Sequence, residues 1–313
     1  MSAGASNVTR LRREQEDLAV PAPSDRSGRV KLLTCFPPGA ILIPAHNAAP
    51  VIDRALRRLA PIAELGTAEI CVICHGCTDD TAERARKYAG VHVIELETAS
   101  KTTALNSGDV WATLWPRLYL DADIEIDPDA IARVFQTLQG SIPAARPLYR
   151  YDTSGASALV RAYYRARRRM PSTRFALWGA GVYAISKVGH ERFDSFPTVT
   201  ADDLFVDHLF SANEKHIVTT VPVRVRTPLT TGALLTILRR NHRALAEMPH
   251  ASTSVSASEI VLSVRGLTSA LDALAYTVLA VASRAALPGR HPGTSAETGR
   301  NAGTRIVMTR NTQ

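Results

Sequence analysis

The sequence predicts an α/β fold: a single domain with a mostly parallel central sheet flanked by helices, plus a C-terminal amphipathic helix. Between residues 40 and 120, short apolar runs of strand length alternate with longer stretches of helical periodicity. Parallel strands need a crossover connection, which is usually a helix, so this alternation indicates consecutive βαβ units. We find no internal repeat and no long linker, which favours one domain.

The expected strands are apolar runs at residues 40–44, 69–74, 91–96 and 117–120. The expected helices between them lie at 49–59, at 78–88 and from 102 to 109. In open parallel sheets, ligands bind beyond the carboxyl ends of the strands. This rule places residues 45–47, 74–79 and 121–123 along one edge of the sheet.

Both ends of the chain depart from this pattern. Residues 1–30 and 288–313 combine Ser, Gly, Pro and mixed charges without a hydrophobic period, so we expect disordered arms there. The folded domain is expected over residues 31–250. Residues 1–30 also lack the apolar run of a signal peptide, which favours a cytoplasmic protein.

Composition narrows the partners without choosing among them. With 45% hydrophobic residues, the chain can build a core without disulfides. Its formal net charge of +8 suits a partner that carries phosphate: a nucleotide, a phospholipid or a nucleic acid. Cys71, Cys74 and Cys77 have the C-x-x-C spacing of some metal sites, but we favour small buried thiols.

Two aspartates, Asp121 and Asp123, follow the fourth expected strand. Carboxylates at this spacing can share a hard divalent cation, and Mg²⁺ or Mn²⁺ completes its shell with phosphate oxygens and water. Because aspartate is also common in solvated turns, the pair needs support from the rest of the sequence.

Other motifs provide that support through their order. The chain reads P-A-H-N at 44–47, H-G-C-T-D-D-T at 75–81, Lys101 with A-L-N-S-G at 104–108, D-A-D at 121–123, and A-D-D at 201–203. This succession resembles the inverting family 2 glycosyltransferases, which share the GT-A fold. The resemblance covers about residues 40–245. It implies a nucleotide-binding half at about 40–125 and an acceptor half at about 126–250.

The resemblance also implies a site for the donor nucleotide. His46 would offer a flat ring to the base and Lys101 a positive charge to the phosphates. UDP is the favoured nucleotide. His75, however, stands where many relatives have an aspartate that recognises uracil, which weakens this choice and leaves GDP and dTDP open. The residues expected in this site are Pro44, Ala45, His46, Asn47, His75, Asp79, Lys101, Asp121 and Ala122.

The implied cofactor is Mn²⁺ or Mg²⁺. Asp123 would be the direct metal ligand, and Asp121 would approach the ribose and the metal. His242 is a candidate third ligand, although an arginine-rich surface helix is the interpretation that we favour for it. Loss of a tryptophan at Ala244, where processive relatives stack a growing sugar chain, indicates a non-processive enzyme.

An inverting transfer needs a base that accepts the proton of the acceptor hydroxyl. Position in the family pattern nominates Asp203, with Asp202 beside it, and adjacent carboxylates raise each other's pKa. The alternative role is an N-cap of the helix expected at 204–210. Both roles can hold, with Asp202 as the cap or as the residue that orients the base, and Asp203 as the base.

Two further groups complete the implied site. The first, expected at the sugar and acceptor, consists of Trp178, Gly179, Ala180 and Gly181, although an ordinary glycine turn is an equal alternative. The second is Arg240 and Arg243, which would close over the diphosphate.

Residues 161–169 interleave arginines with aromatics. A solvated helix face explains this segment, but it lies in the acceptor half, which favours a phosphorylated or lipid-linked acceptor. A nucleic acid is the weaker candidate, because it would not explain the motifs.

A helical region is expected at 251–287, with an amphipathic helix over 260–287. Arg265, Ser269 and Asp272 lie opposite its apolar stripe. We expect packing on the core or on a second subunit, slightly ahead of peripheral contact with the cytoplasmic face of a membrane. The stripe consists of Ile260, Val264, Leu267, Leu271, Leu274, Val278 and Val281.

The sequence thus predicts a metal-dependent glycosyltransferase that moves a sugar from a nucleoside diphosphate sugar to an acceptor hydroxyl. Cell-envelope glycan or glycolipid synthesis is the commonest setting of the family. A nucleotidyltransferase would want a glycine-rich phosphate loop after the first strand, which residues 44–47 do not form. A non-catalytic nucleotide-binding scaffold stays open, although Asp123 and Asp203 argue against it.

Overall fold

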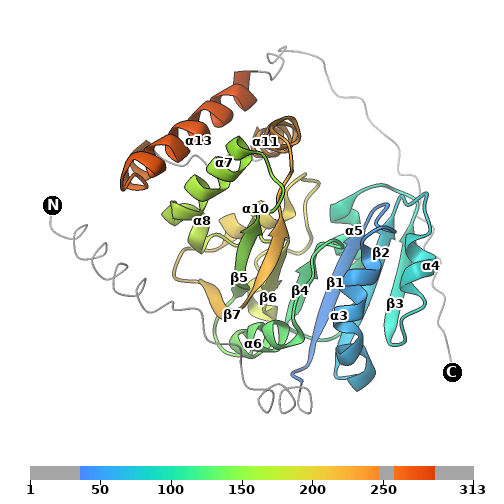
Figure 1. The fold of residues 1–313 in the computed structure, drawn as a ribbon. Coiled ribbons are helices and arrows are strands. Elements are labelled where there is room, and N and C mark those ends of the chain that lie inside the picture. The colour runs from blue at the N-terminus through green and yellow to red at the C-terminus, as the bar shows by residue number, and fades with distance from the viewer. Residues whose placement is uncertain (1–35, 247–256, 286–313) are drawn as a thin grey trace, which may run out of the picture.

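The computed structural model describes residues 36–246 and 257–285, and Figure 1 shows its fold. In this part of the chain, a seven-stranded sheet has the order β3-β2-β1-β4-β6-β5-β7. Only β6 runs antiparallel to its neighbours, β4 and β5; all other pairings are parallel. The strands are β1 (Gly39–Ala45), β2 (Ala68–His75), β3 (Val91–Leu96), β4 (Arg117–Leu120), β5 (Ala144–Asp152), β6 (Val182–Ile185) and β7 (Lys215–Arg226).

The predicted fold class is confirmed, and the four expected strands correspond to β1, β2, β3 and β4. The helix expected at 78–88 is shorter, α4 (Thr81–Ala85), because the residues before it form a turn that is bonded to residues 47–49. The helix expected at 49–59 is α3 (Ile52–Leu65), which ends at Gly66 with φ of 64°. A left-handed residue at this position is a common way to end a helix.

Alternating strand side chains fill two apolar layers, one on each face of the sheet. Ile41 and Ile43 of β1 pack with α3 and α6 (Pro128–Leu138) on one face. Leu42 packs on the other face with α5 (Lys101–Trp111) and α10 (Asp202–Leu209). Because the strands are covered on both faces, their edge of carboxyl ends is the part of the sheet open to a ligand.

Three helices pack against each other above that edge, on the side of β5, β6 and β7 (Figure 1). They are α7 (Ala158–Arg169), α11 (Thr231–Ala246) and α13 (Leu267–Ala285). Val160, Leu234 and Leu279 form the apolar contact among them. The shorter helices are α8 (Pro171–Phe175), α9 (Lys187–His190) and α12 (Ala257–Leu262).

The expected C-terminal helix is different in two respects. It is two helices, α12 and α13, instead of one helix over 260–287. Six residues of the predicted apolar stripe are exposed, from 40% at Val264 to 87% at Leu267, so the expectation that this stripe packs on the core is wrong. No helix in the described ranges is long and apolar enough to cross a membrane.

The face of α13 that packs on the protein contains Asp272, which is 1% exposed. Its Oδ1 accepts a hydrogen bond from Arg165 Nη2 at 2.6 Å, and its Oδ2 accepts one from Arg169 Nη2 at 2.9 Å. Both arginines belong to α7. These ion pairs therefore fix which face of α13 is turned inward.

Replacing Asp272 with asparagine tests this arrangement. The amide cannot satisfy two guanidinium groups, so we expect the free energy of unfolding to fall by about 2 kcal/mol. Urea denaturation would measure the change. The exposed Asp194→Asn exchange is the control, expected to change stability by less than about 0.5 kcal/mol. Equal stability of the two variants would contradict the assignment.

Candidate active site

The site begins with the way α5 starts. Ser100 precedes the helix, and its Oγ accepts a hydrogen bond from the Thr103 backbone N–H at 3.3 Å, as an N-cap does. Lys101 is therefore the first residue of the helix. In this position its side chain reaches the edge where β1 and β4 end.

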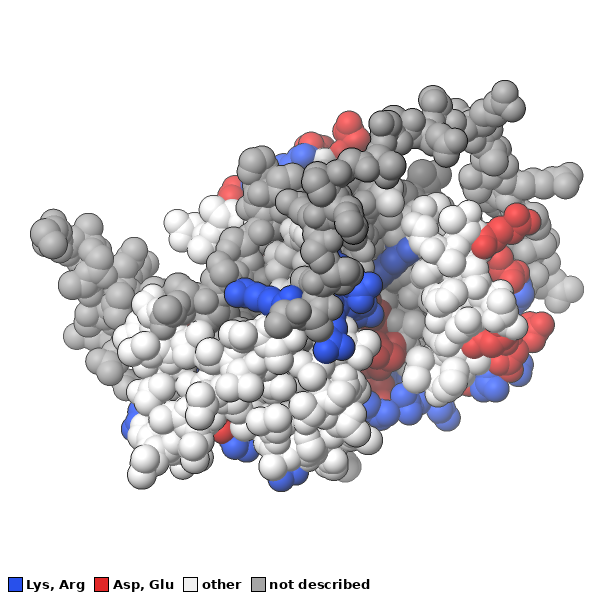
Figure 2. Space-filling model, turned by 90° about the horizontal axis from the view of Figure 1, so that it is seen from above, with Lys and Arg blue, Asp and Glu red and all other residues white. Residues whose placement is uncertain are grey.

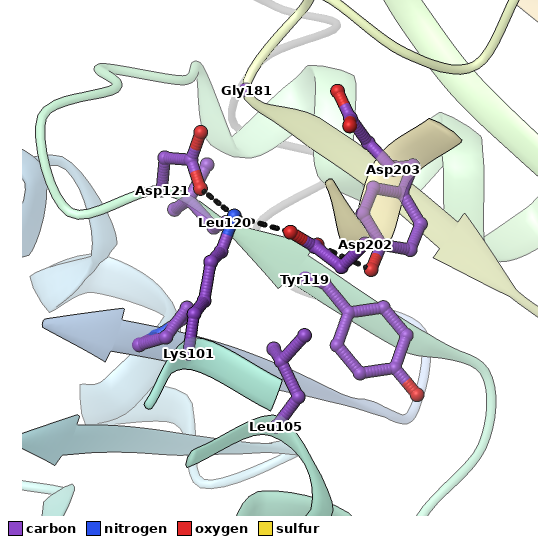
Figure 3. A pocket seen from close by; sticks show the side chains of 10 residues that line it. Lys101, Leu105, Tyr119, Leu120, Asp121, Gly181, Asp202 and Asp203 are labelled. Atoms are coloured by element: carbon purple, nitrogen blue, oxygen red, sulfur yellow. Dashed lines mark hydrogen bonds and ion pairs between the residues drawn. The ribbon is translucent and has the colours of Figure 1, made fainter. Parts of the chain in front are cut away.

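The ammonium group of Lys101 joins two carboxylates from distant parts of the chain. Its Nζ lies 2.7 Å from Asp121 Oδ1 and 2.8 Å from Asp202 Oδ1, as the dashed lines in Figure 3 show. Burial alone would lower the pKa of Lys101, but Asp121, Asp202 and Asp203 outweigh this effect and raise it. Lys101 therefore stays positively charged and holds the two carboxylates together.

Asp202 is a positioning residue. It is 3% exposed, and its Oδ2 accepts a hydrogen bond from the Tyr183 hydroxyl at 2.8 Å. The N-cap role considered for Asp202 is wrong, because α10 begins at Asp202 and Ala201 takes the cap position without a side-chain bond. Both carboxylate oxygens of Asp202 are used to hold Lys101 and Tyr183 instead.

The carboxylate of Asp203 is fixed by two backbone donors. The N–H of Gly179 donates to Oδ2 at 2.9 Å, and the N–H of Leu204 donates to Oδ1 at 2.8 Å. Burial and the neighbouring Asp202 raise the pKa of Asp203 to about 6, although Lys101 and the Gly179 N–H oppose the shift. A carboxyl group with this pKa is largely ionised at pH 7 and still a useful proton acceptor.

Asp121 is held by the segment before β6. Its backbone N–H donates to the carbonyl of Gly181 at 2.9 Å. Gly181 has φ of 66°, and a Cβ there would lie 2.7 Å from Ile124 Cγ1, so no other residue fits without a shift. The glycine turn expected at 179–181 thus has a structural role, since it lets the backbone approach the two aspartates.

Asp121 and Asp123 are suited to a divalent cation. Burial and the charge of Asp121 raise the pKa of Asp123, although Lys101 and Arg226 oppose the shift, so negative charge at this position is only partly compensated. A divalent cation would supply the remaining compensation, and phosphate oxygens would complete its shell. Among the described residues, no three His, Cys, Asp or Glu side chains are placed to bind one ion together. His242 does not complete such a set; its Nε2 is hydrogen-bonded to Ser283 Oγ at 2.9 Å.

A cavity of about 450 Å³ connects these groups. Figure 2, which views this edge from above, shows acidic side chains in a recess with Lys and Arg around it. Arg240 lines the cavity, whereas Arg243 is exposed and does not. The other expected residues that line it are Lys101, Asp121, Asp123, Trp178, Gly179, Gly181, Asp202, Asp203 and His242.

The residues expected at the nucleobase form a second cluster. The rings of His46 and His75 stack with centroids 5.4 Å apart, and burial, with smaller effects of His46 and Lys101, lowers the pKa of His75 to about 4. Asn47 Oδ1 accepts a hydrogen bond from the Thr78 N–H at 2.8 Å. Asp79 Oδ2 accepts one from the Ala49 N–H at 3.1 Å. Asp79 therefore ties two turns together.

Three expected residues, Ala45, Ala122 and Ala180, are buried and do not line the cavity. Pro44 lines a small space beside Lys101. The thiols of Cys71 and Cys74 are free and buried, and burial raises the pKa of each, as expected for inert thiols.

Sequence reasoning missed Arg167 and the tyrosines around it, Tyr151, Tyr163 and Tyr164, all of which line the cavity. The signal was present in the basic and aromatic segment 161–169. Tyr163 and Arg167 are four residues apart, a spacing that places both on one face of a helix. The spacing does not reveal which of several arginines faces the cavity.

Residues 40–181 match the model of the family described as glycosyl transferase family 2. This stretch is therefore a glycosyl transferase family 2 domain, and the predictions of family and of a glycosyltransferase are confirmed at this level. Asp203 lies beyond the matched segment. None of the curated proteins matches the sequence.

Among solved structures, the mannosyltransferase PcManGT from Pyrobaculum calidifontis, in complex with GDP-Man and Mn²⁺, has a TM-score of 0.53. It is 18% identical, over 83% of this chain and 78% of that chain, so the likeness concerns the fold. Glucosyl-3-phosphoglycerate synthase from Mycobacterium tuberculosis in complex with UDP has a TM-score of 0.46 and 19% identity, over 70% of this chain and 86% of that chain. S. aureus TarS in complex with UDP has a TM-score of 0.43 and 16% identity, over 72% of this chain and 69% of that chain.

Replacing Lys101 with methionine tests the electrostatics of the site. The positive charge of Lys101 stabilises the ionised form of Asp203, so its loss should raise the pKa of Asp203 by about one pH unit. Carbon-detected NMR titration of protein labelled at the aspartate carboxyls would measure this pKa. Lys187→Met, at an exposed lysine of α9, should leave it unchanged. An unshifted titration in the Lys101 variant would contradict the coupling.

Proposed function

We propose that this protein is a metal-dependent, inverting and non-processive glycosyltransferase. It would move a sugar from a nucleoside diphosphate sugar, with UDP favoured, to an acceptor hydroxyl. The observation that carries the proposal is the placement of Lys101, Asp121, Asp123 and Asp203 around one cavity at the carboxyl edge of the sheet. Cell-envelope glycan or glycolipid synthesis, at the cytoplasmic face of a membrane, is the setting that we favour.

The donor end of the cavity is the end with Asp121 and Asp123. These two carboxylates would hold Mn²⁺ or Mg²⁺, with the diphosphate providing further oxygens. When bound, the cation neutralises negative charge that develops on the leaving nucleoside diphosphate. One carboxylate oxygen of Asp121 is paired with the ammonium group of Lys101, so Lys101 orients this carboxylate and also adds positive charge to the site.

Asp203 is the base in this proposal. In its ionised form it would accept the proton of the acceptor hydroxyl as that oxygen attacks the sugar from the face opposite the leaving group. The backbone N–H groups of Gly179 and Leu204 fix its direction. Asp202 keeps the pKa of Asp203 high, and Tyr183 and Lys101 hold Asp202 in place.

The turns after β1 and β2 would receive the nucleobase. The stacked rings of His46 and His75 form the aromatic part of this region, and only His46 is exposed. His75 is neutral at pH 7, because burial lowers its pKa to about 4, so it lacks the negative charge with which a carboxylate accepts the N–H of uracil. The choice of UDP therefore depends on the family pattern and needs a direct test.

The first test is calorimetric titration with UDP, GDP, dTDP and CDP, each with Mn²⁺ and with chelator. We expect one nucleotide to bind with Mn²⁺ and to bind at least about tenfold more weakly with chelator or in Asp123→Ala, because the bridge between diphosphate and carboxylate is lost. Asp194→Ala is the control at an exposed aspartate. Nucleotide binding that depends on neither the metal nor Asp123 would contradict the proposed donor site.

The second test concerns the base. Asp203→Asn should lower turnover by about 10²- to 10⁴-fold, because the amide cannot accept the proton, while nucleotide binding is retained. Turnover would be followed as nucleoside diphosphate released from the donor, to water or to an acceptor. In the wild type, the rate should fall as the pH drops through about 6, because protonation removes the carboxylate form of Asp203.

Asp194→Asn is the matched control and should keep both the rate and the pH profile. A variant Asp203→Asn that turns over donor like the wild type would exclude Asp203 as the base. Nucleotide binding without turnover in the wild type would favour a non-catalytic scaffold.

A further inference from the structure

Arg167 of α7 faces the same cavity as Asp203. Its Nε donates to the Tyr151 hydroxyl at 2.9 Å, and its Nη1 donates to the Tyr163 hydroxyl at 3.2 Å. Its guanidinium carbon lies 4.8 Å from the centroid of the Trp178 ring. These contacts fix the plane of the guanidinium group and cover it with aromatic side chains.

No carboxylate of the described residues pairs with Arg167. Arg165 and Arg169 on the same helix differ from it, because both are paired with Asp272. A guanidinium group stays charged in proteins and has five N–H donors, of which the tyrosines take two. A partly enclosed, permanent positive charge without a carboxylate is suited to binding an anionic group from a ligand.

The free end of Arg167 points to the place where the reaction would occur. Its Nη2 lies 3.6 Å from the position that a Cβ on Gly179 would take. The N–H of Gly179 in turn donates to the carboxylate of Asp203. An anion bound by Arg167 would therefore lie next to the hydroxyl that Asp203 deprotonates.

The part of the cavity wall that comes from α11, α12 and α13 combines an apolar portion with polar side chains such as Arg240, Asn241 and Arg284. Its apolar members are Leu234, Ile237, Leu238, Ile260, Ala280 and Val281. A cationic group next to the base and an apolar portion of the wall complement a molecule with one charged and one apolar part. A plain sugar acceptor would leave this apolar portion without a matching surface.

We propose that the acceptor is an amphiphile with an anionic group, a phosphate or a carboxylate, which Arg167 binds while its apolar part lies along α11 and α13. The assignment rests on the proposed function, since it takes the reacting hydroxyl to lie at Asp203. The same chemistry could belong to a carboxylate on the donor sugar, so the experiment has an arm for each source.

The test uses n-octyl phosphate as the anionic amphiphile and n-octyl glucoside as its neutral match, titrated calorimetrically below micelle-forming concentrations and with chelator present. We expect n-octyl phosphate to bind the wild type and to bind Arg167→Gln at least about tenfold more weakly. Arg168→Gln removes the same charge one residue away, at an exposed position, and should bind like the wild type. Arg167→Lys should retain part of the affinity, because it keeps the charge and loses the fork of donors.

Equal affinity of the wild type for the phosphate and the glucoside would overturn the proposal, and this comparison needs no variant to fold. Equal weakening by the substitutions at Arg167 and Arg168 would also overturn it.

For the donor arm, UDP-glucose and UDP-glucuronate are titrated with Mn²⁺. A loss of UDP-glucuronate binding alone in Arg167→Gln would assign the anion to the donor and overturn the acceptor assignment. If no nucleotide binds while n-octyl phosphate depends on Arg167, the proposed function fails and the anion site stands.

Discussion

The ion pairs of Lys101 are the interaction on which the rest of the site depends. Four aspartates line one cavity, and mutual repulsion would keep such a group apart or protonated without a positive charge among them. Lys101 draws Asp121 from the end of β4 and Asp202 from the start of α10 to one point. Burial and the adjacent Asp202 raise the pKa of Asp203, and Lys101 limits this shift. Lys101 thus holds the carboxylates together and keeps the pKa of Asp203 from rising further.

Much of this arrangement could be predicted from the sequence, because it follows from local patterns. Apolar runs predicted the strands, and parallel strands bring their carboxyl ends to one edge, so Asp121 and Asp123 were expected at the edge that Lys101 also reaches in the structure. The roles of individual atoms were not accessible in this way. That Asp202 holds Tyr183 and Lys101, and does not cap a helix, depends on β6 lying next to β4.

The C-terminal helix α13 shows that hydropathy alone does not predict which face of a helix is buried. A stripe such as Leu267, Leu271 and Leu274 normally predicts the buried face. Here one buried carboxylate with two arginine partners orients α13, because turning Asp272 outward would leave Arg165 and Arg169 without it. Periodicity counts apolar residues and cannot include a partner more than 100 residues away in the sequence. The exposed stripe is thus a consequence of the ion pairs.

The same helix contact shapes the cavity. With α13 held on α7 by Asp272, Ala280 and Val281 line the same cavity as Arg167, whose guanidinium group lies over the Trp178 ring. The cavity is lined by the carboxylates near Asp121 and, on α7, by the guanidinium group of Arg167. A neutral acceptor would not be oriented by this arrangement. An acceptor with an anionic group would be oriented by it, since repulsion from Asp121 and attraction to Arg167 favour the same direction of entry.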